Sequence, residues 1–112
     1  QAARQGRRQP RRRRGDHGVR VTAVRVIVEG RVQGVGYRAW VSRQAKSRNL
    51  NGWVRNRGDG SVEAVFAGDQ VTVAAMVEAC RSGPGLAVVS DVRQELWPDQ
   101  PPPGFSVRPS QS

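Results

Sequence analysis

Apolar and polar residues alternate in several segments of the chain, as they do in strands that bury one face. The first segment, residues 21–29, is dominated by β-branched residues, with valine on one face and charged side chains on the other. Residues 52–57, 61–67 and 86–96 carry similar apolar patterns, and residues 104–108 (GFSVR) are typical of a short edge strand. The pattern predicts four main strands and a short fifth one.

Two further segments repeat apolar residues at helical spacing. The first predicted helix, residues 37–48, has an apolar stripe that leaves Ser42, Arg43 and Lys46 outside; the stripe comprises Tyr37, Trp40, Val41 and Ala45. The second, residues 69–82, begins with Asp69 as a helix cap and ends before Gly83 and Pro84. Its buried stripe is predicted to comprise Val73, Met76, Val77 and Cys80.

The order of these elements, strand-helix-strand-strand-helix-strand, predicts an α+β fold. It closes economically as a ferredoxin-like α/β sandwich (βαββαβ), with a mainly antiparallel sheet, both helices on one face and a short C-terminal edge strand. The third strand fits antiparallel between the first two, so the first two run in the same direction. Their carboxyl ends are therefore expected at the same edge of the sheet, roughly 10 Å apart.

Positive charge is concentrated at the N-terminus. The chain of 112 residues has a net charge of +10, and residues 1–20 hold eight arginines opposed only by Asp16. We expect residues 1–19 to be a disordered Arg-rich tail, residues 20–109 to be one domain, and residues 110–112 to be a C-terminal tail. The Arg-rich tail is either a solvated extension or a weak, salt-sensitive contact for nucleic acid.

The chain has one cysteine and one histidine, which limits the catalytic and metal-binding chemistry that it can perform. Cys80 has no partner for an internal disulfide or a multi-cysteine metal site, and His17 lies in the predicted tail. Histidine general-base chemistry in the folded part is therefore excluded, and we expect no metal and no cofactor. No apolar run spans a bilayer, and each predicted helix has one apolar stripe, which its sheet needs. A cytoplasmic monomer without membrane contact is the resulting expectation.

The loop at residues 31–37 is a candidate phosphate site. Its glycines let backbone N–H groups converge, and it leads into a helix N-terminus, where free amides attract anions. Arg38 adds a guanidinium that can form hydrogen bonds to two phosphate oxygens. Asn56 is expected at the same sheet edge, where its carboxamide can orient a water molecule. Three plainer interpretations remain open at this point. They are a tight turn without ligand, a solvated arginine at the start of a helix, and an asparagine that only shapes the hairpin turn between the strands predicted at residues 52–57 and 61–67.

Two long motifs resemble those of the acylphosphatase family. Residues 30–38, GRVQGVGYR, resemble the family's phosphate loop G-x-V-Q-G-V-x-aromatic-R. Residues 52–63, GWVRNRGDGSVE, resemble its second signature G-W-V-x-N-x-x-D-G-x-V-E. The resemblance covers about residues 21–108. Tyr37 stands at a position commonly filled by Phe, and Gly36 where some relatives carry a larger residue.

The resemblance implies hydrolysis of small acyl phosphates to a carboxylate and inorganic phosphate, without a metal or a covalent intermediate. In that scheme Arg38 and Asn56 are the catalytic residues, and Asn56 orients the attacking water. The loop amides hold the phosphoryl oxygens, which makes the substrate-binding set Val32, Gln33, Gly34, Val35, Gly36 and Tyr37.

Two other functions are weighed against this one. A ferredoxin-like nucleic-acid-binding module would present stacked aromatics on its central strands, whereas the first strand offers Val, Ile and Ala and the third only Phe66. Similar domains also begin larger carbamoyl-transfer maturation proteins, but the sequence shows neither a cysteine-rich zinc segment nor a transferase portion after Arg108. An independent small enzyme is therefore preferred.

Overall fold

The computed structural model describes residues 20–110, which contain seven helices and strands. In chain order they are β1 (Val21–Arg31), α1 (Tyr37–Ser47), β2 (Asn51–Asn56), β3 (Val62–Asp69), α2 (Gln70–Ser82), β4 (Val88–Leu96) and β5 (Phe105–Val107). The predicted order of elements is confirmed. The predicted Arg-rich tail, residues 1–19, lies outside the described residues, as do residues 111 and 112.

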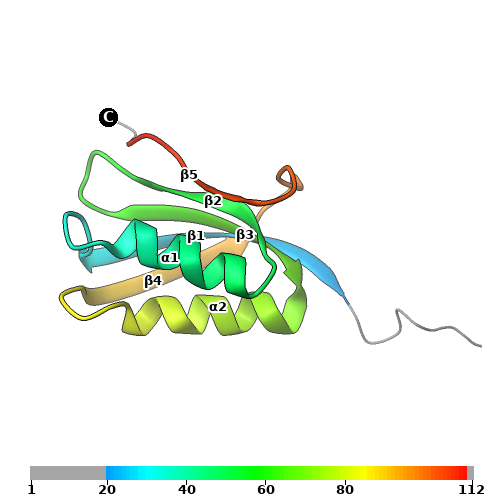
Figure 1. The fold of residues 1–112 in the computed structure, drawn as a ribbon, viewed down its shortest axis with the longest axis horizontal. Coiled ribbons are helices and arrows are strands. Elements are labelled where there is room, and N and C mark those ends of the chain that lie inside the picture. The colour runs from blue at the N-terminus through cyan, green and yellow to red at the C-terminus, as the bar shows by residue number, and fades with distance from the viewer. Residues whose placement is uncertain (1–19, 111–112) are drawn as a thin grey trace, which may run out of the picture.

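The strands form one sheet in the order β4-β1-β3-β2-β5. Neighbouring strands are antiparallel except β2 and β5, which run parallel. Both helices cover the same face of the sheet (Figure 1), so the predicted ferredoxin-like sandwich is confirmed. Because β3 lies between β1 and β2, those two strands run in the same direction and end at one edge of the sheet, as predicted.

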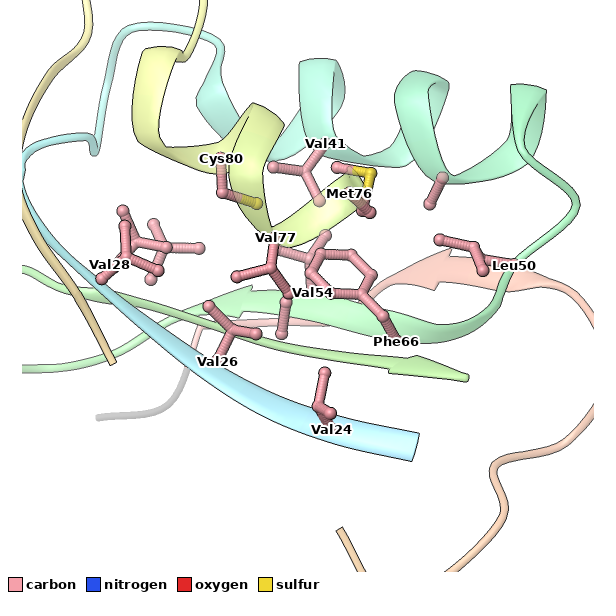
Figure 2. Packing of buried hydrophobic residues seen from close by; sticks show 14 of the residues in the cluster. Val24, Val26, Val28, Val41, Leu50, Val54, Phe66, Met76, Val77 and Cys80 are labelled. Atoms are coloured by element: carbon pink, nitrogen blue, oxygen red, sulfur yellow. The ribbon is translucent and has the colours of Figure 1, made fainter. Parts of the chain in front are cut away.

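The core fills the space between the helices and the sheet. Figure 2 shows Val41 of α1 and Met76 and Cys80 of α2 packed above Val54 and Phe66 of the sheet. The valines of the predicted buried face of the first strand also belong to this cluster; they are Val24, Val26 and Val28. Asp69 caps α2, since its side chain accepts from the backbone N–H of Thr72.

The buried face of α1 is wider than its predicted stripe. Tyr37, Val41 and Ala45 are buried as predicted, but Trp40 is only half-buried. Ser42, predicted to lie outside the stripe, is buried. The helix packs against β2, β5 and α2, so neighbours on more than one side cover it.

The first and fourth strands differ from the predicted bounds at their paired ends. β1 continues two residues further than predicted, because Gly30 and Arg31 still pair with β4. β4 begins at Val88 rather than at residue 86, and Leu86 is 78% exposed. β4 is an edge strand, and of its residues only Val92 is buried. An apolar residue on such an edge has no second neighbouring strand to cover it.

The face of the sheet opposite the helices carries an aromatic cluster rather than an open stacking platform. Phe66, the aromatic residue considered for nucleic-acid stacking, points into the core between sheet and helices. Trp53 of β2 is buried instead beneath the guanidinium groups of Arg55 and Arg108, which lie 4.9 and 4.6 Å from its ring centroid. Trp97 meets Trp53 edge to face. Base stacking on Trp53 would require both arginines to move.

No helix within residues 20–110 has the length and the apolar character that a membrane crossing requires.

Candidate active site

A pocket of about 220 Å³ lies at the sheet edge where β1 and β2 end. Its walls come from the loop after β1, the first turn of α1, the end of β2 and the end of β5. The lining residues are Val32, Gly34, Gly36, Tyr37, Arg38, Ala39, Asn56 and Val107. The fold therefore brings Arg38 and Asn56, which belong to different motifs in the sequence, into one pocket.

The loop between β1 and α1 has the backbone geometry of an anion cradle. Gly34 and Gly36 have φ angles of +75° and +79°, which residues with a side chain rarely adopt. Gly36 precedes the first residue of α1, and no side chain caps this helix end. The first helical hydrogen bond runs from the Trp40 N–H to the Gly36 carbonyl, which leaves the amides of the first turn for another acceptor. Such a helix end attracts negative charge.

Arg38 is the pocket's cation. It stands in the first turn of α1, is half-buried, and makes no ion pair with any of residues 20–110. The other arginines near this edge are engaged elsewhere or lie outside the pocket lining. Arg55 forms an ion pair with Glu63 on the face of the sheet opposite the helices. The Nη2 atom of Arg57 lies 3.9 Å from Oδ2 of Asp59. The guanidinium of Arg38 is therefore available to an anion in the pocket.

Asn56 ends β2 on the opposite side of the pocket. Its Oδ1 atom is buried and accepts no hydrogen bond from any of the described residues. An unpaired buried amide oxygen costs about 1–3 kcal/mol, so stability alone does not account for an asparagine here. Asn56 lines the same pocket as Arg38.

Two members of the predicted substrate-binding set do not line the pocket. Gln33 points to the β2–β3 hairpin, where its Nε2 donates to the carbonyls of Arg57 and Ser61, both at 2.8 Å. Val35 packs against the hydrophobic core. Successive residues of the loop point in different directions, so Val32, Gly34 and Gly36 line the pocket while the residues between them support the loop from outside.

Tyr37 forms part of the pocket wall and joins the two helices. Its hydroxyl donates to the Cys80 carbonyl at 2.8 Å, and its ring lies 5.6 Å from that of Trp40. Burial raises the pKa of Tyr37 far above its ordinary value, so the phenol stays protonated. Burial also raises the pKa of the Cys80 thiol to about 12. The thiol therefore stays protonated, and Cys80 is a core residue rather than a nucleophile.

Ala39 and Val107 line the pocket but were not predicted from the sequence. Val107 reaches it because β5 pairs in parallel with β2, which places Val107 opposite Val54, on the helix side of the sheet. The sequence predicts β5 as an edge strand without saying which edge it joins. The predicted helix does place Ala39 in the first turn beside Arg38, so the sequence contained a signal for Ala39 that the prediction did not use.

Within residues 20–110 there is no group of three or more His, Cys, Asp or Glu side chains arranged to hold a metal ion.

Comparison with known proteins identifies the family of the chain. The family model described as Acylphosphatase matches residues 24–107. The chain belongs to the acylphosphatase family. An acylphosphatase from Azorhizobium caulinodans is 53% identical over 83 residues, which cover 74% of this chain and 88% of that protein. The hydrolase class predicted from the two motifs is thereby confirmed.

Solved acylphosphatase structures share the fold. The acylphosphatase from Coxiella burnetii superposes with a TM-score of 0.76 at 36% identity, covering 79% of this chain and 93% of that one. The acylphosphatase from Bacillus subtilis superposes with a TM-score of 0.74 at 37% identity, covering 80% of this chain and 99% of that one. Both motifs and all the residues that line the pocket lie within residues 24–107, the region that the family model matches.

Proposed function

We propose that the chain hydrolyses small acyl phosphates to a carboxylate and inorganic phosphate by direct attack of water on phosphorus. The proposal rests on one observation above all. Among residues 20–110, a single pocket holds an arginine without an ion pair, a helix N-terminus without a side-chain cap and an asparagine whose buried oxygen has no partner. Membership of the acylphosphatase family supports it independently.

Arg38 and the loop amides bind the phosphoryl group in this proposal. The guanidinium forms two hydrogen bonds to equatorial oxygens, and the amides of residues 32–37 supply further donors at the positive end of the α1 dipole. These donors are fixed in place before the substrate arrives. They stabilise the charge that spreads over the equatorial oxygens in the transition state, at little cost in reorganisation.

Asn56 positions the nucleophile. Its Oδ1 accepts a hydrogen from a water, which directs the water's lone pair at phosphorus from the side opposite the acyl oxygen. A bond forms between the water oxygen and phosphorus while the bond from phosphorus to the acyl oxygen breaks. The electron pair leaves with the carboxylate, and a substrate phosphate oxygen takes the water's proton.

The chemistry itself does not demand a metal or a strong base. A carboxylate is a good leaving group, so holding the reactants in line and stabilising the phosphoryl charge are sufficient to carry the reaction. The proposal therefore assigns no residue to proton abstraction from water. It also assigns no covalent phosphoryl-enzyme intermediate.

Benzoyl phosphate is the probe that tests the proposal. The full chain, incubated with it in the presence of EDTA, is expected to release benzoate and inorganic phosphate in equal amounts. The variant that combines Arg38→Ala with Asn56→Ala is the negative control and should show only spontaneous hydrolysis. Hydrolysis that stops on addition of EDTA, or that is equal in the control, would contradict the proposal.

We also propose that the chain acts as a monomer in the cytoplasm and has no nucleic-acid partner in its folded part. The apolar stripe of each helix faces the sheet, which leaves no second stripe for a partner chain. The single cysteine, Cys80, is buried and free, as suits a reducing compartment. Light scattering at micromolar concentration should give a mass of about one chain; a stable dimer would overturn this part of the proposal.

A further inference from the structure

Gln33 joins the phosphate loop to the hairpin that follows Asn56. Its single Nε2 atom donates one hydrogen to the Arg57 carbonyl and one to the Ser61 carbonyl, both at 2.8 Å. The two partners also determine the orientation of the amide group. Both are carbonyl oxygens, which cannot donate a hydrogen, so the nitrogen rather than the oxygen of the amide must face them. Both hydrogens of the amide nitrogen are thus used on one structural element.

The hairpin at residues 57–61 has hydrogen bonds of its own. The Arg57 N–H donates to the Ser61 carbonyl at 2.9 Å, and the Gly60 N–H donates to the Arg57 carbonyl at 3.2 Å. Asp59 accepts from both the N–H and the hydroxyl of Ser61, and these bonds lower the pKa of its carboxyl. Gln33 therefore attaches the loop to a preformed anchor instead of shaping the hairpin.

This attachment is a direct hydrogen-bonded link between the phosphate loop and the hairpin. Within residues 20–110, loop 32–36 shares no other hydrogen bond with the hairpin. The cradle of amides and Arg38 lies on the loop side, and Asn56 directly precedes Arg57 on the hairpin side. The bonds that Gln33 makes therefore connect the cradle side of the pocket with the hairpin that follows Asn56.

We infer that Gln33 is a positioning residue, which holds the phosphate cradle at the distance from Asn56 that in-line attack requires. The inference rests on the proposed function of the pocket. Gln33 does not line the pocket, so it acts through the two elements it joins. Its loss leaves each half of the site intact but lets the halves move relative to each other. Turnover should then suffer more than phosphate binding.

Gln33→Met tests this, because methionine has nearly the same length but no N–H donor. We expect kcat for benzoyl phosphate to fall on the order of 10-fold to 100-fold, the usual cost of a misplacement of about 1 Å. KM and the Kd for inorganic phosphate should stay within about threefold of the parent values. Gln94→Met, the same change on an exposed residue of β4, is the matched control and should alter none of these constants.

A double-mutant cycle separates positioning from general stabilisation. If Gln33 acts by positioning Asn56, then Asn56→Ala should lower kcat much less in the Gln33→Met background than in the parent chain. The same cycle with Gln94→Met should be additive. A merely structural role for Gln33 predicts a lower melting temperature with an unchanged kcat per folded molecule and an additive cycle, and this outcome overturns the inference.

Gln33→Asn keeps the experiment decisive if the methionine variant does not fold. It retains the amide but is one methylene too short to reach both carbonyls, so it should give a smaller loss of kcat with the same non-additivity. An inactive parent chain contradicts the proposed function itself. An active parent chain with fully active Gln33 variants contradicts only the role of Gln33.

Discussion

Arg38, in the first turn of α1, and Asn56, the last residue of β2, line the same pocket. The sheet order produces this relationship. β3 lies antiparallel between β1 and β2, so the loop that leaves β1 and the hairpin that leaves β2 are at the same edge. A cation suited to an anion and an amide suited to a water are therefore brought together by the topology of the backbone.

Arg38→Ala should impair both phosphate binding and turnover. The variant removes the positive charge of Arg38 from the pocket lining, and losing such a donor costs about 3 kcal/mol, or more than 100-fold in kcat/KM. Calorimetry with inorganic phosphate should show weaker binding in parallel. Arg43→Ala, an exposed residue of the same helix, is the control and should leave both measurements unchanged. Normal phosphate affinity in Arg38→Ala would place the anion elsewhere.

Asn56→Ala should abolish turnover without weakening phosphate binding. The proposed role of Asn56 is to place the water, which inorganic phosphate does not need. Because the Oδ1 of Asn56 is buried without a partner among the described residues, its removal should also leave the free energy of unfolding unchanged or raise it by about 1 kcal/mol. Urea unfolding and phosphate titration measure the two effects. A large loss of stability would instead make Asn56 a structural residue of the hairpin.

The sequence predicted the fold well because local signals agreed with one another. Alternating valines in β1, the Asp69 cap of α2 and the Asp-Gly turn after β2 each favour the structure that the whole chain adopts. The errors occur where the three-dimensional surroundings of a residue, rather than the local sequence pattern, determine whether it is buried. Ser42 is buried because α1 has neighbours on several sides, and Leu86 is exposed because it lies in the turn before β4.

The sequence predicted pocket residues only within the two motifs. Arg38 and Asn56 are found together where the sheet order places them. Gln33 belongs to the phosphate-loop motif, but the sequence does not show that its side chain faces away from the pocket. Val107 was missed because its position depends on the parallel pairing of β5 with β2, a contact between distant segments that no local pattern specifies.

Glu63→Gln should lower the free energy of unfolding at neutral pH and make that free energy less dependent on pH in the acid range. Burial would raise the pKa of Glu63, but hydrogen bonds from Arg25 and Arg55, at 2.6 and 2.7 Å, outweigh burial and hold the pKa below its ordinary value. The carboxylate therefore stabilises the fold at neutral pH, and this contribution is lost as pH falls through the lowered pKa.

Urea unfolding of the Glu63→Gln variant should give a loss of about 1–3 kcal/mol at pH 7, which shrinks toward zero well below pH 4. Glu95→Gln is the matched control, since Glu95 approaches Arg25 at 3.6 Å but is largely exposed, and should cost at most about 1 kcal/mol. A loss for Glu63→Gln that is constant from pH 3 to pH 7 would show that shape, not charge, is what Glu63 contributes.

Tyr37→Phe should lower stability while leaving hydrolysis nearly intact. The Tyr37 hydroxyl donates to the Cys80 carbonyl in the last turn of α2, and the residue four positions further on is Pro84, which has no N–H to donate. The phenylalanine ring still fills the pocket wall, but the buried carbonyl is left without that donor. We expect a loss of about 1–2 kcal/mol in urea unfolding, with kcat and KM within about twofold of the parent. Unchanged stability would mean that the Cys80 carbonyl finds another donor, and a large fall in kcat would mean that this bond also positions the start of α1.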